Sequence, residues 1–187
     1  MEFKIDIKIF LIALVFLLVN QIYMYILFMT FAIIHECFHL LAGIILGYKV
    51  KSVRIMPLGL SIAFNEKEEE YNTKIRNSNF NNVKKIIILL MGPISNIVIA
   101  FFFMLLNMAI PVYINVLIAI FNLLPIYPLD GGQILNRVIR IFYGNFEAYK
   151  ISNSVNNIIM SILTALASIG LLYTKNIAII FIIIFLW

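Results

Sequence analysis

The chain has 187 residues, of which 63% are apolar and 12% are charged, and its mean hydropathy is +1.03. A soluble domain is about 45–50% apolar and about 25% charged, so this composition excludes an ordinary soluble protein and indicates an integral membrane protein. In such a protein positive charge marks the cytoplasmic loops, so the formal net charge of +5 does not indicate a nucleic-acid partner. We expect one domain, residues 1–187, in contact with the lipid bilayer.

Long apolar runs follow one another along the chain and predict an all-α polytopic membrane protein with about six transmembrane helices. A polar pair, Asn20 and Gln21, separates the first two runs, and Gly47 ends the second. In chain order, the predicted spans are about 7–19, 22–46, 85–107, 111–124, 155–173 and 176–187.

Two segments between the spans have a different pattern. Residues 49–64 alternate polar and apolar side chains around Pro57-Leu-Gly59, which predicts a small β-hairpin at the membrane edge. Residues 65–82 are polar and are expected to form a solvated loop. After the fourth span, residues 125–132 contain two prolines and two glycines, which predict a non-helical loop, and residues 133–143 then predict a short amphipathic helix.

The basic residues predict the orientation of the chain. With the N-terminus in the cytoplasm, all lysines and arginines except Lys175 fall on the cytoplasmic side of the predicted spans. The positive-inside rule therefore predicts a multi-pass protein of the cell membrane with a cytoplasmic N-terminus. In this orientation residues 35–39 and 125–132 both lie toward the cytoplasmic side.

The second predicted span contains the sequence His35-Glu36-Cys37-Phe38-His39, which holds both histidines of the chain. On a helix, residues four apart project from one face, as two zinc ligands require, and Glu36 is placed to act as the general base. A charged side chain inside a span costs at least about 2.5–3.5 kcal/mol. A lone His or Glu would be read as a satisfied core polar group, but the three residues at this spacing favour a metal site.

A catalytic zinc site has three protein ligands and an open position for water. Cys37 lies about 100° around the helix from its neighbours and is a poor third ligand, and the acidic run at 66–70 is expected to be solvated. Asp130 lies in the stiff loop after the fourth span. It is either a cap or turn residue or the third zinc ligand, because non-helical backbone at membrane depth is tolerated where it lines a cavity.

Three motifs occur together in this order: His35-Glu36-x-x-His39, Gly92-Pro93-Ile-Ser-Asn96 and Asn122-Leu-Leu-Pro125-Ile-Tyr-Pro128-Leu-Asp130-Gly131-Gly132. They resemble the site-2 protease family of intramembrane zinc metalloproteases, and their layout is most similar to the sporulation group that cleaves a membrane-tethered pro-sigma factor. The resemblance implies that His35, His39 and Asp130 hold one Zn²⁺ per chain and that Glu36 is the general base.

The chain departs from that family at two places. Phe38 stands where the family usually has glycine, which affects local helix packing and not the ligands. The sporulation proteases also carry a C-terminal nucleotide-sensing domain, whereas this sequence stops at Trp187, so the sequence does not support ATP-linked regulation.

Asn96 and Asn122 lie in apolar surroundings, where an amide needs a hydrogen-bonding partner. Each is either an interhelical hydrogen-bonding residue or a donor to the substrate peptide or to the developing oxyanion. Asn115 is expected to be a packing residue or to mark the end of a span.

The resulting hypothesis is hydrolysis of a peptide bond in or near the transmembrane segment of a membrane-tethered protein, such as a pro-sigma or anti-sigma factor. The edge of the 49–64 hairpin would hold that substrate by strand addition. The alternatives are a catalytically inactive scaffold or chaperone with a vestigial zinc site, and a metal or ion transporter. Glu36 argues against the scaffold, and the absence of repeated halves argues against the transporter. The sequence indicates no oligomeric state.

Overall fold

The computed structural model describes residues 2–5, 8–18, 20–56, 59–64 and 75–174. They are mostly helical, and the chain forms two compact units, Met1–Leu123 and Leu124–Trp187, which we describe separately. The single domain expected from the sequence stays a prediction. The first unit contains β1 (Glu2–Ile5), α1 (Lys8–Leu18), α2 (Ile22–Ile45), β2 (Val50–Met56), β3 (Gly59–Phe64), α3 (Ile75–Leu105) and α4 (Ala109–Asn122), and the second contains α5 (Asp130–Thr174).

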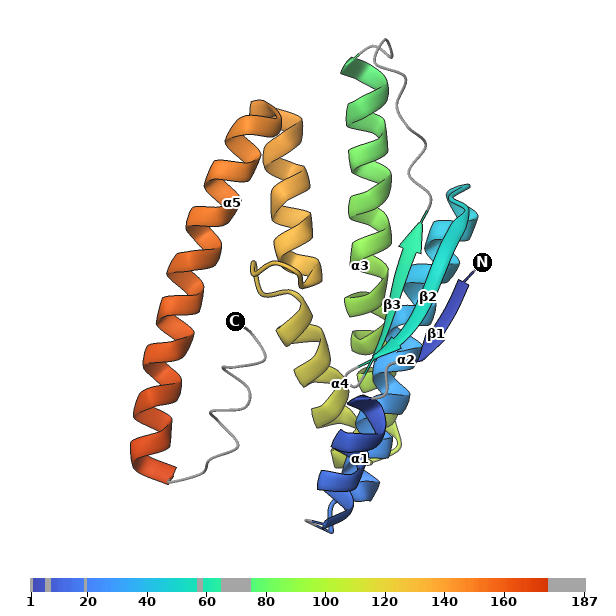
Figure 1. Ribbon diagram of the computed structural model, residues 1–187. Coiled ribbons are helices and arrows are strands. Elements are labelled where there is room, and N and C mark those ends of the chain that lie inside the picture. Colours follow the sequence, from blue (N-terminus) through green and yellow to red (C-terminus); the bar gives the residue numbers. More distant parts are fainter. Residues whose placement is uncertain (1, 6–7, 19, 57–58, 65–74, 175–187) are drawn as a thin grey trace. The chain divides into compact units, whose positions relative to one another are not determined.

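The strands form one three-stranded sheet in the order β1-β2-β3 (Figure 1). β2 and β3 pair antiparallel within the range predicted as a hairpin, with Met56 opposite Gly59, and residues 57–58 between them lie outside the described residues. β1, which the sequence pattern does not predict, pairs parallel to β2, with Glu2 opposite Ser52. β3 packs against α2, so the sheet is attached to the helices of the first unit. Its position at the membrane edge stays a prediction.

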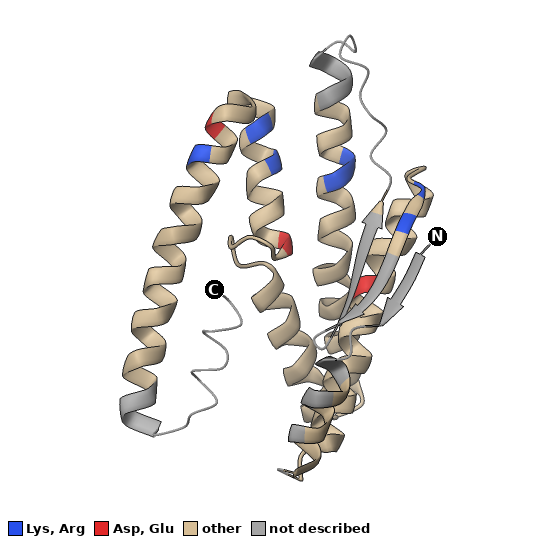
Figure 2. Cartoon of the chain, in the orientation of Figure 1, with Lys and Arg blue, Asp and Glu red and all other residues tan. Residues whose placement is uncertain are grey.

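Among the described residues, Ile22–Ile45 and Asn79–Leu105 are long and apolar enough to cross a bilayer, whereas Ala109–Asn122 is shorter. Figure 2 shows long uncharged stretches on these helices. The count of six transmembrane helices therefore stays a prediction, and the predicted span at 176–187 lies outside the described residues.

The boundaries of α3 correct one expectation. The polar loop predicted over 65–82 is wrong for residues 75–82, which form the first turns of α3. The Asn-rich sequence there is hydrophilic, but a helix that continues beyond the apolar layer satisfies its backbone internally and needs no apolar side chains. Residues 65–74 lie outside the described residues.

The core of the first unit lies between α2, α3 and α4, with α3 packed against both other helices. The rings of Phe31 on α2 and Phe103 on α3 meet edge to face, with centroids 5.7 Å apart. Gly43 of α2 is covered by the ring of Phe64 from β3. The small residue Gly43 lets α2 and β3 approach closely, and van der Waals packing of this kind is a main source of attraction between elements in lipid.

The second unit is a loop followed by a helical hairpin (Figure 1). α5 breaks at Gly144, whose φ of 83° and ψ of 177° are accessible to glycine and strained for other residues. Asn136 holds the two arms together, because its Nδ2 donates to the carbonyl oxygen of Ala148 at 3.3 Å and to Oγ of Ser152 at 3.1 Å. The second arm thus begins before the span predicted at 155–173.

Candidate metal centre

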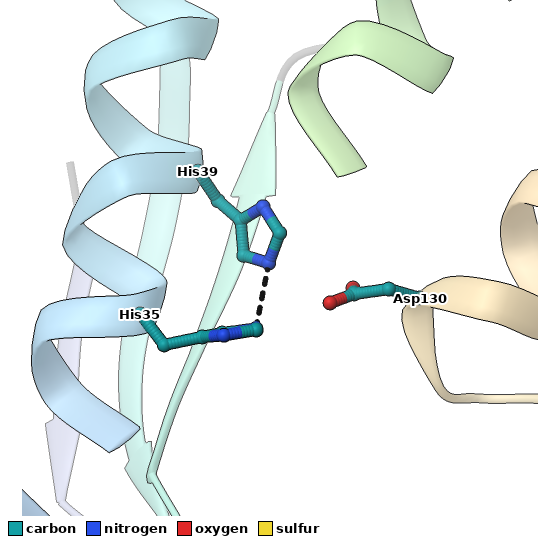
Figure 3. A group of neighbouring side chains, drawn as sticks. All are labelled: His35, His39 and Asp130. Atoms are coloured by element: carbon teal, nitrogen blue, oxygen red, sulfur yellow. Dashed lines mark hydrogen bonds between the residues drawn. The ribbon is translucent and has the colours of Figure 1, made fainter. Parts of the chain in front are cut away.

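His35 and His39 lie one helical turn apart on α2 and are 2% and 6% exposed. Figure 3 shows both imidazole rings leaving the helix on the same side. Their Nε2 atoms are 3.0 Å apart. The sequence-predicted pairing of these two rings is therefore present in the first unit.

The face of α3 opposite these rings carries Ile88, Gly92 and Asn96, which follow one another at four-residue spacing and share one side of the helix. Nδ1 of His39 donates to the carbonyl oxygen of Ile88 at 2.7 Å. Nδ1 of His35 pairs with Oδ1 of Asn96 in a short hydrogen bond. Each ring is thus held at Nδ1 by an acceptor from α3.

Gly92 lies between those two acceptors and directly against the rings. A Cβ atom built at this position would collide with Nε2 of His39 and with Nε2 of His35. Because both rings are fixed at Nδ1, they have little freedom to move away. Glycine is therefore required here for the close approach of α3 to the histidine pair, a role that the spacing Gly92-x-x-x-Asn96 alone did not reveal.

These contacts make the pair suitable for a metal ion. A neutral imidazole that donates through Nδ1 has a proton-free Nε2, and two such lone pairs face each other inside an apolar bundle. They repel unless a proton or a cation lies between or beside them. Two nitrogen ligands on a tetrahedral zinc ion, each about 2.0–2.1 Å from the metal, lie roughly 3.3 Å apart, close to the observed 3.0 Å. The donor set fits zinc, and an Nδ1–H held by an acceptor is the usual support of a zinc-bound histidine.

The two predicted amides make different contacts. Asn96 is fully buried; its Oδ1 meets His35 and its Nδ2 donates to Oδ1 of Asn115 at 2.9 Å. These contacts indicate that Asn96 positions the ring of His35. A direct contact between Asn96 and substrate stays a prediction. Asn122 is half-buried near the end of α4, and its Nδ2 donates to the carbonyl oxygen of Ile118 at 3.1 Å. If Asn122 contacts the substrate, its second amide hydrogen would donate that hydrogen bond.

Glu36, Cys37 and Phe38 are half-buried on α2 between the histidines. Glu36 is the only carboxylate on this helix. Phe38 is accommodated within the helix without displacing either imidazole from its partner on α3. The local helix therefore supplies the expected histidine pair together with an adjacent carboxylate.

Asp130 belongs to the second unit. The sequence predicted a loop until residue 132, but α5 already begins at Asp130, which is therefore the first helical residue and not its cap. A carboxylate in a first helical turn is stabilised by the helix dipole by about 0.3–1 kcal/mol, which is its ordinary structural role. Figure 3 draws this side chain at the start of its helix. Its place in a metal site stays a prediction.

The turn before Asp130 is tightly folded. A Cβ at Gly132 would collide with the backbone of Ile126 and Tyr127, so only glycine fits there. Nε2 of Gln133 donates to the carbonyl oxygen of Pro128 at 2.9 Å, and the amide of Tyr127 donates to Oδ1 of Asn156 at 3.0 Å. The loop is thereby bound both to the first turn of α5 and to its second arm, which fixes the direction in which Asp130 leaves the backbone.

The sequence matches the model of peptidase family M50 over residues 23–113 and 106–167. The chain belongs to the M50 peptidase family. It is 26% identical over 135 residues to a curated zinc metalloprotease of Methanocaldococcus jannaschii, in a match that covers 71% of this chain and 39% of that protein. This chain thus spans about two fifths of the length of the curated relative that it matches.

The fold is similar to that of a solved site-2 protease from Methanocaldococcus jannaschii. The two structures superpose with a TM-score of 0.69 at 20% identity, over 100% of this chain and 88% of that one. At this identity the likeness concerns the fold. An M50 member is expected to use zinc, and the histidine pair of α2 is the feature of the first unit that meets this expectation.

Proposed function

We propose that this M50 chain is an intramembrane zinc metallopeptidase that hydrolyses a peptide bond in or near the transmembrane segment of a membrane-tethered protein. The observation that carries the proposal is the pair of buried Nε2 atoms of His35 and His39, 3.0 Å apart, with each ring anchored at Nδ1 by α3. Family membership supports the same chemistry. The expected location is the cell membrane, with the N-terminus and the site toward the cytoplasm.

Three residues of the chain are assigned to the ion. His35 and His39 would bind through Nε2, and Asp130 would add one carboxylate oxygen, which together leave one position of a tetrahedral zinc open. A bound zinc ion supplies a water acidified toward a pKa of about 7 and polarises the substrate carbonyl. Two features support Asp130 as the third ligand: the tightly folded turn that precedes it and its place in the motif of residues 122–132.

Glu36 would be the general base and acid. It follows His35 directly on α2, so one helical turn carries two ligands and the carboxylate. In the proposed mechanism Glu36 removes a proton from the attacking water and later donates it to the nitrogen of the leaving amine. Proton transfer of this kind contributes typically about 10²–10⁴-fold to a rate.

The substrate has to present an extended backbone, because a peptide bond inside an intact helix is sterically protected. Among the described strands, β3 lies at an edge of the sheet and packs on the same helix that carries the histidines. Strand addition to β3 would hold an unwound segment beside α2. Asn122 would then contact the peptide or the developing oxyanion. A membrane-tethered pro-sigma or anti-sigma factor is the substrate class that the sequence motifs favour.

The test is cleavage of a membrane-tethered substrate by the Glu36→Gln variant, compared with wild type and with Glu147→Gln. Glu147 is a half-buried acid on α5, so its replacement controls for the loss of a carboxylate. We expect Glu36→Gln to lower the cleavage rate by about 10²–10⁴-fold while zinc remains bound, and Glu147→Gln to cleave normally. Wild-type cleavage by Glu36→Gln would refute the mechanism. Zinc binding by wild type without cleavage of any substrate in a panel would instead favour an inactive scaffold.

A further inference from the structure

Asn96 and Asn115 are two fully buried amides in the apolar core formed by α3 and α4. An amide buried without hydrogen bonds is costly, and these two satisfy each other: Nδ2 of Asn96 donates to Oδ1 of Asn115 at 2.9 Å. Nδ2 of Asn115 in turn donates to the carbonyl oxygen of Pro111 at 2.9 Å. With the His35 contact, these bonds form a continuous series from a backbone carbonyl to the imidazole.

The direction of this series is determined at its far end. The carbonyl of Pro111 can only accept a hydrogen bond, so Asn115 must turn its NH₂ group toward it and its Oδ1 toward Asn96. Asn96 must then direct its own NH₂ toward Asn115 and its Oδ1 toward His35. The imidazole can meet that oxygen only through a protonated Nδ1. Each orientation is thus dictated by the preceding one.

His35 needs this control more than His39 does. His39 donates directly to a backbone carbonyl, which cannot reverse its role. The partner of His35 is an amide, and an amide rotated by 180° has nearly the same shape but presents a donor in place of an acceptor. A rotated Asn96 would present its NH₂ group to His35 and favour the tautomer with the proton on Nε2. A protonated Nε2 has no free lone pair and cannot bind a metal ion.

We propose that Asn115 is a positioning residue for the metal site, acting through Asn96 to keep the proton of His35 on Nδ1 and leave Nε2 available for zinc. This inference rests on the proposed function, because it takes the two Nε2 atoms as ligands. It assigns a role at the site to a residue that the sequence indicated only as a packing or span-end residue. Partners of this kind, one shell beyond the ligands, typically change metal affinity or activity by about 10–100-fold.

The experiment measures zinc affinity in the full chain, in detergent, by competition with a chromophoric chelator. Asn115→Leu removes the orienting acceptor and is expected to weaken zinc binding by about 10–100-fold. The control is Ile118→Ala, which cuts a buried side chain one turn away on α4 and is expected to lower the melting temperature without changing zinc affinity. Equal zinc affinities in wild type and Asn115→Leu would overturn the inference.

A rescue variant separates orientation from a general loss of packing. An aspartate at position 96 has two acceptor oxygens, so it holds the His35 Nδ1–H whichever way it is turned and no longer needs Asn115. Asn96→Asp combined with Asn115→Leu should therefore bind zinc at least about tenfold more tightly than Asn115→Leu alone. If the single variant does not fold, Asn96→Asp is compared with the double variant, and the double should bind at least as tightly. Weaker binding by the double variant in either comparison contradicts the inference.

A second readout needs no metal. Because the chain has only two histidines, ¹⁵N-histidine labelling gives imidazole spectra that can be assigned with one substitution. Zinc-free wild type should show His35 protonated at Nδ1, and Asn115→Leu should show a mixture of both tautomers. If His35 keeps the same tautomer in Asn115→Leu, the role of Asn115 is overturned but the proposed function is not. If zinc binding by the wild-type chain does not depend on His35 and His39, both the role of Asn115 and the proposed function are overturned.

Discussion

The histidine pair and the Asp130 turn orient their side chains in different ways. In the first unit, His35 and His39 are oriented by hydrogen bonds from another helix, to Asn96 and to the carbonyl of Ile88. In the second unit, the segment before Asp130 is fixed by bonds within its own turn and to the second arm of α5. The orientation of the histidines therefore depends on packing between α2 and α3, and the orientation of Asp130 depends on local backbone geometry.

This difference predicts how each region responds to change. A disturbance of the α2–α3 contact should reach both imidazoles together, because Ile88, Gly92 and Asn96 share one helix face. A disturbance of the Asp130 turn should remain local and leave the histidines in place. Glycine substitutions test the contrast well, since each adds a single methyl group at a defined contact.

Among the glycine substitutions, the largest effect is expected from Gly92→Ala. Its Cβ would collide with both Nε2 atoms, and a displacement of about 1 Å at a catalytic group can cost about 10²-fold in rate. We expect cleavage to fall by about that factor, together with weaker zinc binding. The matched control is Gly43→Ala on α2, whose Cβ meets the ring of Phe64 and not the imidazoles. Retention of full activity by Gly92→Ala would show that the rings are not held as described.

Gly132→Ala should have an intermediate effect. The added methyl group collides with the backbone of Ile126 and Tyr127, and neither can move as a flexible side chain would. We expect the turn to open and Asp130 to shift, which lowers zinc affinity roughly tenfold, the low end for residues beyond the ligands. The histidine tautomers, followed by ¹⁵N spectra, should be unchanged. A changed His35 spectrum would mean that the two regions are not independent.

Gly144→Ala should have the smallest effect on the site. A side chain at φ 83° and ψ 177° is strained by about 1–3 kcal/mol, so thermal unfolding in detergent should occur at a lower temperature. Zinc affinity and cleavage at low temperature should match wild type, because the break joins the arms of α5 well after Asp130 in the sequence. A selective loss of zinc in this variant would contradict the assignment of Gly144 as a purely structural break.

The predictable features were those that depend on residues close in sequence. The spacing of His35 and His39 fixes their common face on any helix, and the alternation over residues 49–64 predicted the strands that the structure has as β2 and β3. The pairing of β1 with β2 was not predictable, since a four-residue strand carries little pattern and its partner lies about fifty residues away.

Other features depended on packing that no local pattern encodes. The role of Asn115 follows from the alignment of α4 with α3, which the sequence does not specify. Helix α5 starts at Asp130 and not at 133 because Gly132 allows the first turn to pack onto the loop, whereas two adjacent glycines predicted a loop. The common face of the two histidines and the need of Asn96 for a hydrogen-bonding partner could thus be predicted from the sequence, but the particular contacts that orient the two rings could not.

The most direct test of the account is the zinc content of the purified full chain, measured for wild type, the double variant His35→Ala/His39→Ala, and Asp130→Ala. We expect one zinc ion per wild-type chain, none in the double histidine variant, and weakened binding in Asp130→Ala, with Glu147→Gln as the control that retains the ion. Zinc bound equally by wild type and the double histidine variant would contradict the central claim that these two imidazoles form the metal site.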